Sequence, residues 1–330
     1  MRLLVMNCHE PWIYQLRVLD ADLDIVIGLE GRYTTTWDDA MRPQPPRSRL
    51  LSLDEVHATP AGAWDCIIAH NVTDLLDLKA IDAPVLLMIH DFLEGRLAQQ
   101  ASTLPAAAMR ERLGQYLRLR GAHAVAISST KATSWGVRGE AVPNFVDPAD
   151  YGPARFDKPA GLRVANHIWS KRVFLQWDLH EAAFEGLPVT LIGHNPEFGV
   201  DAAAGWDALR EELAAHRFFI HTANPRFEDG YNMASLEAMA AGLPVIGNRH
   251  PTSPVVHGVS GFLSNDPGEL RGYAELLLTD AALARRMGEA ACATVADRFT
   301  AVRFRHGMTE AIATARRKHA RRARAARAGV

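Results

Sequence analysis

The chain repeats one pattern of hydrophobic and polar positions, in which a short apolar run is followed by a polar stretch and a segment with helical spacing. The runs are apolar on both faces, which is typical of strands in a parallel sheet covered by helices. They fall at 3–5, 25–27, 66–69, 85–89, 124–127, 163–165, 189–192, 218–220 and 244–246. Amphipathic segments at 108–120, 270–278 and 281–296 alternate with them. The pattern predicts an α/β protein made of βαβ units.

The length of 330 residues predicts two domains, because one hydrophobic core usually serves roughly 150 residues. Prolines and turn formers between 143 and 153 interrupt the pattern, and we place a linker at about 148–160. The expected division is an N-terminal domain at 1–150, a C-terminal domain at 151–310 and a basic helix or tail at 311–330. A proline-rich stretch at 38–49 predicts a long loop, either a plain surface loop or one that binds an acceptor.

Composition places the chain among ordinary globular proteins. Hydrophobic residues make up 48% and charged residues 22%, and the formal net charge is -2, so no polycationic or polyanionic partner is implied. The cysteines Cys8, Cys66 and Cys292 lie far apart and form no Cys-x-x-Cys pair, which argues against disulfides and a zinc site and favours a reducing cytosol. The apolar start is too short for a signal peptide, and no run reaches a membrane span.

The segment 217–246 reads as one βαβ unit whose loop carries Glu228, Asp229 and Gly230 and leads into a helix at 232–241. Ligands of such sheets bind beyond the carboxyl ends of the strands. The helix start would face a diphosphate, the carboxylates would accept hydrogen bonds from sugar hydroxyls, and the glycine would let the backbone approach the ligand. Glu237, about one and a half turns into the helix, points either into this crevice or to solvent. The arrangement suits a sugar nucleotide.

This stretch also resembles a known family. Asp229-Gly-Tyr-Asn-Met-Ala-Ser-Leu-Glu-Ala-Met-Ala-Ala-Gly-Leu-Pro-Val-Ile246 is similar to the signature of family-four, GT-B type retaining glycosyltransferases. Val142-Pro-Asn-Phe-Val-Asp147 and His257-Gly-Val-Ser-Gly-Phe-Leu263 resemble further segments of that family, so the resemblance spans about 65–300. It implies a GT-B fold, with two Rossmann-like doubly wound parallel-sheet domains facing a central cleft. It also implies that Asp229, or the adjacent Glu228, contacts the donor sugar and that Glu237 binds the nucleotide ribose.

One departure from the family pattern concerns the donor diphosphate. The family reads Gly-Arg-Leu, three variable residues and Lys-Gly, whereas this chain reads Ala165-Asn-His-Ile-Trp-Ser-Lys-Arg172. Lys171 falls on the family lysine, but Asn166 replaces the arginine, so one charge-assisted contact of about 1.5–3 kcal/mol is missing. Arg172 or His167 is the expected compensation. Alternatively, Lys171 and Arg172 are surface cations before a helix.

In the N-terminal half, His90 ends an apolar strand and resembles the family histidine that contacts the donor sugar. The alternative is a structural hydrogen-bonding histidine. Asp91 would orient it or cap the next turn. The first loop carries His9, Glu10 and Trp12, which would contact acceptor or sugar; equally, Trp12 would pack beneath the loop. His70 and Asn71 end another strand and could line the same edge.

The resulting assignment is a glycosyltransferase that moves a sugar from a nucleotide-diphosphate sugar, such as a UDP-sugar or GDP-sugar, to a hydroxyl acceptor on a glycan, a lipid-linked molecule or a small molecule. The resemblance implies retention of configuration. We also expect no cofactor, and no metal because no Asp-x-Asp metal motif accompanies the pattern. The predicted catalytic residues are His90, Asp229 and Lys171. The predicted donor-binding residues are Glu237, Glu228, Gly230, Tyr231, Asn232, Met233, Asn166, Arg172 and Gly193.

Two other functions share these features. A GT-B type sugar-nucleotide epimerase would use the carboxylates and histidines as acid and base on the donor itself, although the Glu237-Ala-Met sequence disfavours it. A noncatalytic sugar-nucleotide-binding protein is the other alternative, and it is compatible with Asn166 and the unusual first loop. Turnover across a donor and acceptor panel distinguishes all three.

The end of the chain is strongly basic. From residue 315 it carries seven cations and no acid on an alanine-rich, helix-prone background, at Arg316, Arg317, Lys318, Arg321, Arg322, Arg324 and Arg327. A solvated helix is one interpretation, and contact with an anionic membrane is the other, since each cation near such a surface contributes roughly 1 kcal/mol. We therefore expect a cytoplasmic protein that either stays in solution or lies at the inner face of the cell membrane, and no nucleic-acid partner.

Overall fold

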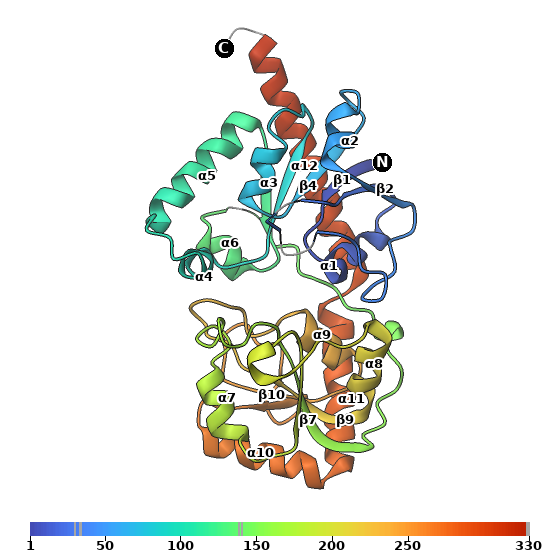
Figure 1. Ribbon diagram of the computed structural model, residues 1–330, viewed down its shortest axis with the longest axis vertical. Helices are drawn as coiled ribbons and strands as arrows, with labels where there is room; N and C mark the ends of the chain where they lie inside the picture. Colours follow the sequence, from blue (N-terminus) through green and yellow to red (C-terminus); the bar gives the residue numbers. More distant parts are fainter. Residues whose placement is uncertain (30, 33–34, 138, 140, 328–330) are drawn as a thin grey trace. The chain divides into compact units, whose positions relative to one another are not determined.

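The computed structural model describes residues 1–29, 31–32, 35–137, 139 and 141–327, and its chain divides into two compact units (Figure 1). Unit 1 consists of Met1–Asn144 together with Ala301–Val330, and unit 2 is Phe145–Thr300. We expected boundaries at 150/151 and 310/311. The structure places both boundaries earlier in the chain, and the residues from Ala301 onward belong to unit 1.

Unit 1 contains a six-stranded sheet in which every neighbouring pair is parallel, in the order β3-β2-β1-β4-β5-β6. The strands are β1 (Arg2–Met6), β2 (Asp22–Val26), β3 (Ser48–Leu51), β4 (Cys66–Ala69), β5 (Val85–Ile89) and β6 (His123–Ala126). The register puts Val5 opposite both Ile25 and Ile68. The chain passes from β1 to one edge and then returns to the other side of β1 at β4. The carboxyl ends of β1 and β4 therefore form the switch point, where ligands of doubly wound sheets bind.

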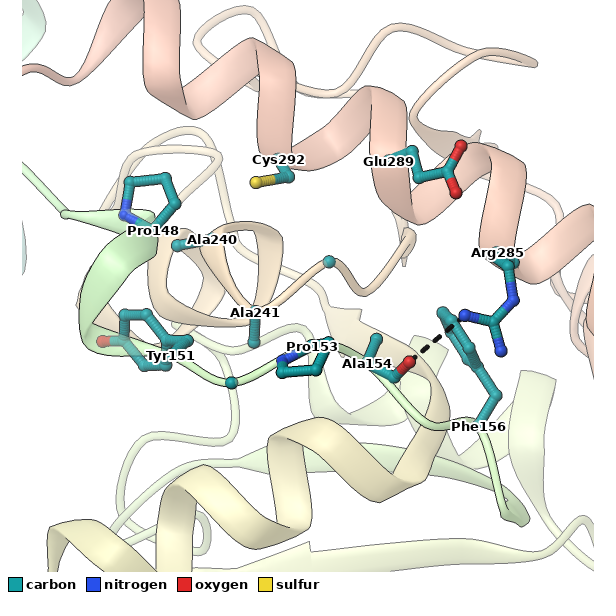
Figure 2. Close-up of a pocket in the computed structure, with 12 residues that line it drawn as sticks. Pro148, Tyr151, Pro153, Ala154, Phe156, Ala240, Ala241, Arg285, Glu289 and Cys292 are labelled. Carbon is teal, nitrogen blue, oxygen red and sulfur yellow. Dashed lines mark hydrogen bonds between the residues drawn. The ribbon is translucent and has the colours of Figure 1, made fainter.

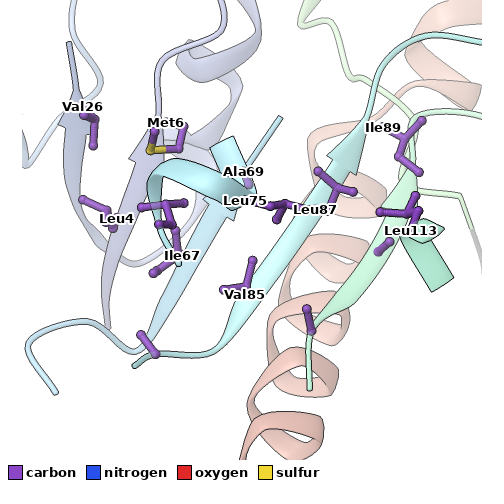
Figure 3. Packing of buried hydrophobic residues seen from close by; sticks show 14 of the residues in the cluster. Leu4, Met6, Val26, Ile67, Ala69, Leu75, Val85, Leu87, Ile89 and Leu113 are labelled. Atoms are coloured by element: carbon purple, nitrogen blue, oxygen red, sulfur yellow. The ribbon is translucent and has the colours of Figure 1, made fainter. Parts of the chain in front are cut away.

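Helices cover both faces of this sheet. They are α1 (Glu10–Tyr14), α2 (Leu53–Ala58), α3 (Val72–Asp77), α4 (Leu93–Gln99), α5 (Ala106–Arg120), α6 (Ser129–Ser134) and α12 (Ala301–Arg327), with a 3-10 turn, η1, at Gln15–Val18. Figure 3 shows alternate residues of the strands packed on one face with Leu75 of α3 and Leu113 of α5. Successive side chains point to opposite faces, which explains why the interior strands β4 and β5 are apolar at every position.

Helix α12 packs on unit 1 through its first half, where it contacts β4, β5 and β6. Its buried residues recur every three or four positions, at Phe304, Met308, Ala311, Ile312 and Ala315. The basic segment expected at 311–330 is thus the continuation of one helix that begins at Ala301. Arg316 lies 3.4 Å from Asp65, and Arg322 lies 3.2 Å from Asp82, so part of its charge is paired with unit 1.

Unit 2 contains a five-stranded sheet, again parallel throughout, in the order β11-β10-β9-β7-β8. Its strands are β7 (Lys158–Val164), β8 (Val189–Ile192), β9 (His216–His221), β10 (Val245–Gly247) and β11 (Gly261–Leu263). Its helices are α7 (Trp177–Phe184), α8 (Trp206–Ala215), α9 (Met233–Ala240), α10 (Pro267–Thr279) and α11 (Ala281–Arg298), with 3-10 turns η2 (Pro148–Asp150) and η3 (Pro196–Phe198).

Two hydrophobic clusters lie on opposite faces of the unit 2 sheet. Phe219 of β9 belongs to the cluster with α9 and α11, whereas Phe218 and Ile220 belong to the cluster with α7 and α10. The chain visits β8 on one side of β7 before it crosses to β9 on the other. The loops after β7 and β9 therefore meet at the switch point of this unit.

The prediction of an α/β fold with parallel sheets is confirmed. The stretch predicted as a long loop at 38–49 ends in a short edge strand, β3, which the sequence pattern missed. Among the described residues, no helix combines the length and the apolar character that a membrane crossing requires.

Candidate functional site

The loop after β9 leads into α9, whose first turn is closed by a reciprocal cap. The side chain of Asn232 accepts a hydrogen bond from the Ser235 backbone N–H at 2.8 Å, and the Ser235 hydroxyl accepts one from the Asn232 N–H at 2.9 Å. This capping box fixes where the helix begins, and its start carries the positive end of the helix dipole. Asn232 was predicted to bind donor; its side-chain oxygen is used by the cap.

The two predicted carboxylates of this segment are both buried. Asp229 is 2% exposed and Glu237 is 5% exposed. A carboxylate that only decorates a helix surface stays in water, because burying a charge is costly unless it is compensated. The alternative that Glu237 is a solvated helix carboxylate is therefore wrong. It lies on a helix whose Leu236 and Met239 are fully buried, as expected.

Gly230 is needed for a contact within the protein. A methyl group at this position would lie 2.7 Å from Cγ of His250. The imidazole therefore fills the space beside Gly230 in which the sequence predicted a ligand. The Gly230 N–H donates to the Thr252 hydroxyl at 2.7 Å, and Nε2 of His250 donates to the Glu228 carbonyl at 3.1 Å. His250 thus shapes the acidic loop from the neighbouring strand β10.

Sequence reasoning missed His250 and the neighbouring Asn248. Asn248 is buried and exchanges two hydrogen bonds of 2.9 Å with the backbone of Ala223, which ties the loops after β9 and β10 together. A signal was present, since both residues follow directly on an apolar strand and parallel strands end at one edge. Tyr231 and Met233, also predicted, are partly buried, and Tyr231 packs edge-on against Phe299.

The loops after β7 and β8 are locked to each other by amide side chains. Asn166 accepts a hydrogen bond from the His194 N–H at 2.8 Å. Asn195, which is fully buried and was not predicted, donates to the Ala165 carbonyl at 2.7 Å and accepts from the Ile168 N–H at 2.9 Å. Asn166 therefore positions the turn, in the place where the family pattern has an arginine.

Gly193 lies in the same interlock. Its φ of 142° suits glycine, and a methyl group there would lie 2.0 Å from the Ala165 carbonyl oxygen. The glycine thus permits the close approach of two backbone segments at the edge of the sheet. This contact explains its place in the sequence without reference to a ligand, although the turn that it permits borders the predicted diphosphate site.

The two predicted cations of the β7 loop differ in their surroundings. Arg172 forms ion pairs with Asp178 and Glu181 of α7. Within the described part of the chain, Lys171 has no ion-pair partner, and its backbone N–H donates to the His167 carbonyl in a turn. An anionic ligand would have to compete with two carboxylates for Arg172 but with none for Lys171, so Lys171 is the better candidate for a phosphate.

Unit 2 contains two cavities, one lined by residues of the β7 loop and one remote from that loop. One, of about 470 Å³, opens where β9, β10 and β11 end, and is lined by Arg172, Asn224, Asn248, Arg249 and Asn265 among others. The other, of about 290 Å³, lies at the far end of α9 beside Ala240, Ala241 and Cys292 (Figure 2). There Arg285 donates to the Ala154 carbonyl at 3.3 Å. The carboxyl end of a helix repels anions, so the second cavity does not suit a diphosphate.

In unit 1, the predicted residues gather at the carboxyl ends of β1, β4 and β5. His90 follows β5, and its Nε2 lies 2.9 Å from Nδ1 of His70, which follows β4. Burial lowers the pKa of His90 to about 3 and that of His70 well below its usual value, so both rings are neutral at physiological pH. His70, not Asp91, holds the ring of His90. Asp91 instead accepts from Arg96 at 2.8 Å.

The first loop is packed more tightly than an acceptor site would require. Trp12 is 1% exposed and lies edge-on against the rings of His70 and His90, at centroid distances of 4.6 Å and 5.1 Å. Glu10 is buried and accepts from the Asp38 N–H at 3.3 Å, and burial raises its pKa. His9 caps α1. Trp12 therefore supports the histidines from beneath, which was the alternative to acceptor contact.

Comparison with known proteins agrees with this fold. Anabaena Alr3699/HepE, solved with UDP-glucose, matches with a TM-score of 0.70 at 16% identity over 95% of this chain and 100% of its own. Sucrose-phosphate synthase from Thermosynechococcus elongatus matches with a TM-score of 0.64 at 14% identity, over 94% and 98%. S. aureus TarM matches with a TM-score of 0.57 at 12% identity, over 75% and 55%. No curated protein matches the sequence at a significant level.

The paired parallel sheets and these matches define the GT-B class of fold. Residues 184–280, which include the acidic loop and α9, match the family Glycosyl transferases group 1. This matched segment lies within the part of the chain that resembles GT-B glycosyltransferases, and the fold agrees with that resemblance.

Proposed function

We propose that this enzyme transfers a sugar from a nucleotide-diphosphate sugar to a hydroxyl acceptor, with retention of anomeric configuration and without a metal ion in the reaction. The observation that carries the proposal is the pair of buried carboxylates, Asp229 and Glu237, at either end of the capped start of α9. Sugar and ribose hydroxyls are strong partners for such carboxylates, and the helix start suits the diphosphate between them.

Each donor-side residue has a role in this proposal. Glu237 accepts hydrogen bonds from the ribose, and Asp229 accepts them from the sugar hydroxyls. Lys171, unpaired within the described ranges, stabilises the charge that develops on the leaving diphosphate. His90 contacts the donor sugar through the ring atoms that His70 leaves open. Asn166 and Gly193 maintain the turn beside the diphosphate.

The transfer step needs no protein base. The acceptor oxygen forms a bond to the anomeric carbon on the face from which the diphosphate departs, while the bond between that carbon and the phosphate oxygen breaks. The acceptor proton passes to the departing phosphate oxygen. The anomeric carbon gains positive character as the bond breaks, so the negative leaving group and the fixed cation Lys171 lower the barrier together. No metal is required if Lys171 and the dipole of α9 supply the positive charge.

The acceptor side of the proposal concerns the basic helix. Arg317, Arg321 and Arg324 of α12 are exposed, whereas Arg316 and Arg322 are paired with acids of unit 1. We infer that the exposed cations hold the enzyme at an anionic membrane, where a lipid-linked hydroxyl acceptor would be presented. The surface of the helix that faces away from unit 1 is the part that would contact headgroups.

A donor and acceptor panel tests the proposal. UDP-sugars come first, because the Anabaena protein was solved with UDP-glucose, followed by GDP- and dTDP-sugars. We expect Glu237→Gln to raise the donor KM about 10- to 100-fold, in keeping with about 1.5–3 kcal/mol for a hydrogen bond to a charged group. Glu289→Gln, an exposed carboxylate on α11, is the matched control and should behave as wild type.

Three outcomes contradict parts of the proposal. Binding of nucleotide sugars without turnover on any acceptor would indicate the noncatalytic alternative. Conversion of the donor sugar in the absence of an acceptor would indicate an epimerase. A product of inverted anomeric configuration, read by nuclear magnetic resonance, would overturn retention and leave the fold assignment intact.

A further inference from the structure

Three potential metal ligands lie together at the switch point of unit 1. Cys8 follows β1, His70 follows β4 and His90 follows β5, and these three strands are neighbours in the sheet. Ligand atoms of the three side chains all lie within 4.8 Å of one another. Sequence reasoning did not find this cluster, because the residues are far apart in the chain and match no metal-binding spacing.

The two histidines share a single proton. Nδ1 of His70 and Nε2 of His90 lie 2.9 Å apart, and two neutral imidazoles at this distance need one hydrogen between them. His70 is 5% exposed, and its other ring nitrogen, Nε2, has no hydrogen-bond partner among the described residues. His70 can therefore carry its hydrogen on Nε2 and leave Nδ1 open to a ligand without breaking another hydrogen bond of that ring.

The chemistry of the cluster matches a borderline divalent ion. Neutral imidazole is the form that binds metals, and burial keeps both rings neutral at physiological pH. Burial, with the carboxylates Asp74 and Glu10 nearby, raises the pKa of the Cys8 thiol. The same carboxylates would offset part of the charge of a dication. Asp91 adds to that negative charge, while Lys131 and Arg96 oppose it.

We propose that Cys8, His70 and His90 bind Zn²⁺, and that the bound ion inhibits the enzyme by withdrawing His90 from the donor sugar. The ion would take the place of the shared hydrogen, which moves to the other nitrogen of its own ring, and the proton of the thiol would pass to water. Tetrahedral zinc with Zn–N bonds of about 2.0–2.1 Å sets its nitrogen ligands about 3.3 Å apart, so the rings must separate by only about 0.4 Å. Water would supply the fourth ligand. The inhibitory part rests on the proposed role of His90.

Cobalt is the probe for the site, because Co²⁺ replaces Zn²⁺ and gives visible bands that report tetrahedral geometry and a thiolate charge-transfer band. The full-length protein, treated with a chelator and desalted, is titrated with Co²⁺ and then with Zn²⁺. We expect one equivalent of Co²⁺ to bind with a charge-transfer band, and Zn²⁺ to displace it. Absence of that band in the wild-type protein would overturn the proposal.

Single substitutions assign the ligands. Cys8→Ser should remove the charge-transfer band and weaken Co²⁺ binding at least about 10-fold, and His70→Gln should weaken it similarly. Cys292→Ser is the matched control, since neither Cys8 nor Cys292 forms a disulfide and both are partly buried, and it should keep the full spectrum. Circular dichroism confirms that each variant is folded. A charge-transfer band that persists in Cys8→Ser would refute the site.

The inhibitory step has its own readout. Zn²⁺ should inhibit transfer by the wild-type enzyme, whereas Cys8→Ser should keep the basal rate and need at least about 10-fold more Zn²⁺ for the same inhibition. Unchanged turnover with the site filled, as judged by the spectrum, would refute the inhibitory step. The spectra need no substrate, so they test the metal site even if no glycosyl transfer is found.

Discussion

The imidazole of His250 occupies the space that a side chain at position 230 would need, because a methyl group on Gly230 would lie 2.7 Å from its Cγ. The same ring donates to the carbonyl of Glu228 at 3.1 Å. The loop that carries both neighbouring acids is thus held by a residue from the loop after β10, the next strand of the sheet. The position of Asp229, between Glu228 and Gly230, depends on this packing.

Gly230→Ala should impair both packing and turnover. The new methyl group must displace His250 or the loop, and overpacking of this kind typically costs about 1–3 kcal/mol of stability. We expect kcat/KM to fall at least about 10-fold, because the loop carries Asp229. Urea unfolding and steady-state kinetics measure the two effects. Gly272→Ala is the control, since the same methyl group in α10 meets nothing within 4 Å and should leave activity unchanged.

A second substitution checks the cause. His250→Ala alone should lower activity, and in combination with Gly230→Ala it should restore much of the stability lost to the methyl group. Strict additivity of the two stability changes would mean that His250 is not what the methyl group meets.

The two cations of the β7 loop should contribute unequally. Lys171→Ala should reduce kcat/KM by about 10- to 100-fold, as expected for a charge-assisted contact of about 1.5–3 kcal/mol with the diphosphate. Arg172→Ala should reduce it less, since Arg172 is paired with Asp178 and Glu181. The measurement is the kinetics of both variants with one donor. An equal or larger loss from Arg172→Ala would reverse the assignment.

Acid should destabilise unit 1 through its buried histidines. Burial lowers the pKa of His9 from 6.5 to about 4 and that of His90 from 6.5 to about 3. Below pH 6.5 the unfolded chain therefore binds protons that the folded chain does not, and stability falls as the pH falls from 6.5 toward the folded-state values. The contribution is fully present above the unfolded-state pKa.

His9→Asn isolates one such group, because asparagine can still cap α1 but does not titrate. We expect its free energy of unfolding to change less between about pH 7 and about pH 5 than that of the wild type. Urea titrations at both pH values provide the comparison. The carboxyls Glu10 and Asp74, whose pKa values are raised, have the opposite dependence and are common to both proteins. An identical pH dependence would show that the pKa of His9 is the same in the folded and the unfolded protein.

Membrane contact through α12 is testable with vesicles. Arg317→Glu, Arg321→Glu and Arg324→Glu together should weaken sedimentation with vesicles rich in anionic lipid, since each cation near the surface contributes roughly 1 kcal/mol. Wild-type binding should fall with added salt and be absent on neutral vesicles. Equal sedimentation of the wild type with neutral and anionic vesicles would contradict an electrostatic membrane site.

Local sequence patterns predicted much of the secondary structure. The helix expected at 232–241 is α9, Met233–Ala240, with Asn232 as its cap, and the segment expected at 281–296 begins at Ala281 in α11. These signals come from neighbouring residues: helical spacing and capping side chains. The packing of α12 on the sheet of unit 1 could not be predicted in this way. The apolar stripe of the helix indicates that one face is buried, but it does not indicate which sheet covers that face.

The candidate site shows the same contrast between residues of one contiguous segment, which could be predicted, and residues brought together by the fold, which could not. Asp229 and Glu237 were predicted from one contiguous motif, and their burial agrees with a role beyond the helix surface. His250, Asn195 and the pairing of His70 with His90 join segments that only the folded sheet brings together. Asn166 looked like a weakened phosphate ligand in the sequence, and its bond to the His194 N–H became visible only when β7 and β8 were paired.

The return of α12 to unit 1 also determines the order in which the chain can finish folding. Phe304 and Met308 belong to the packing of a sheet whose six strands all precede residue 127. During synthesis, unit 2 is complete once residue 300 has emerged, while part of the sheet of unit 1 is still uncovered because α12 follows unit 2 in the chain. Unit 1, whose strands are translated before unit 2, therefore completes its folding after unit 2. A chain truncated before residue 301 would contain a complete unit 2 and a unit 1 with an exposed apolar face.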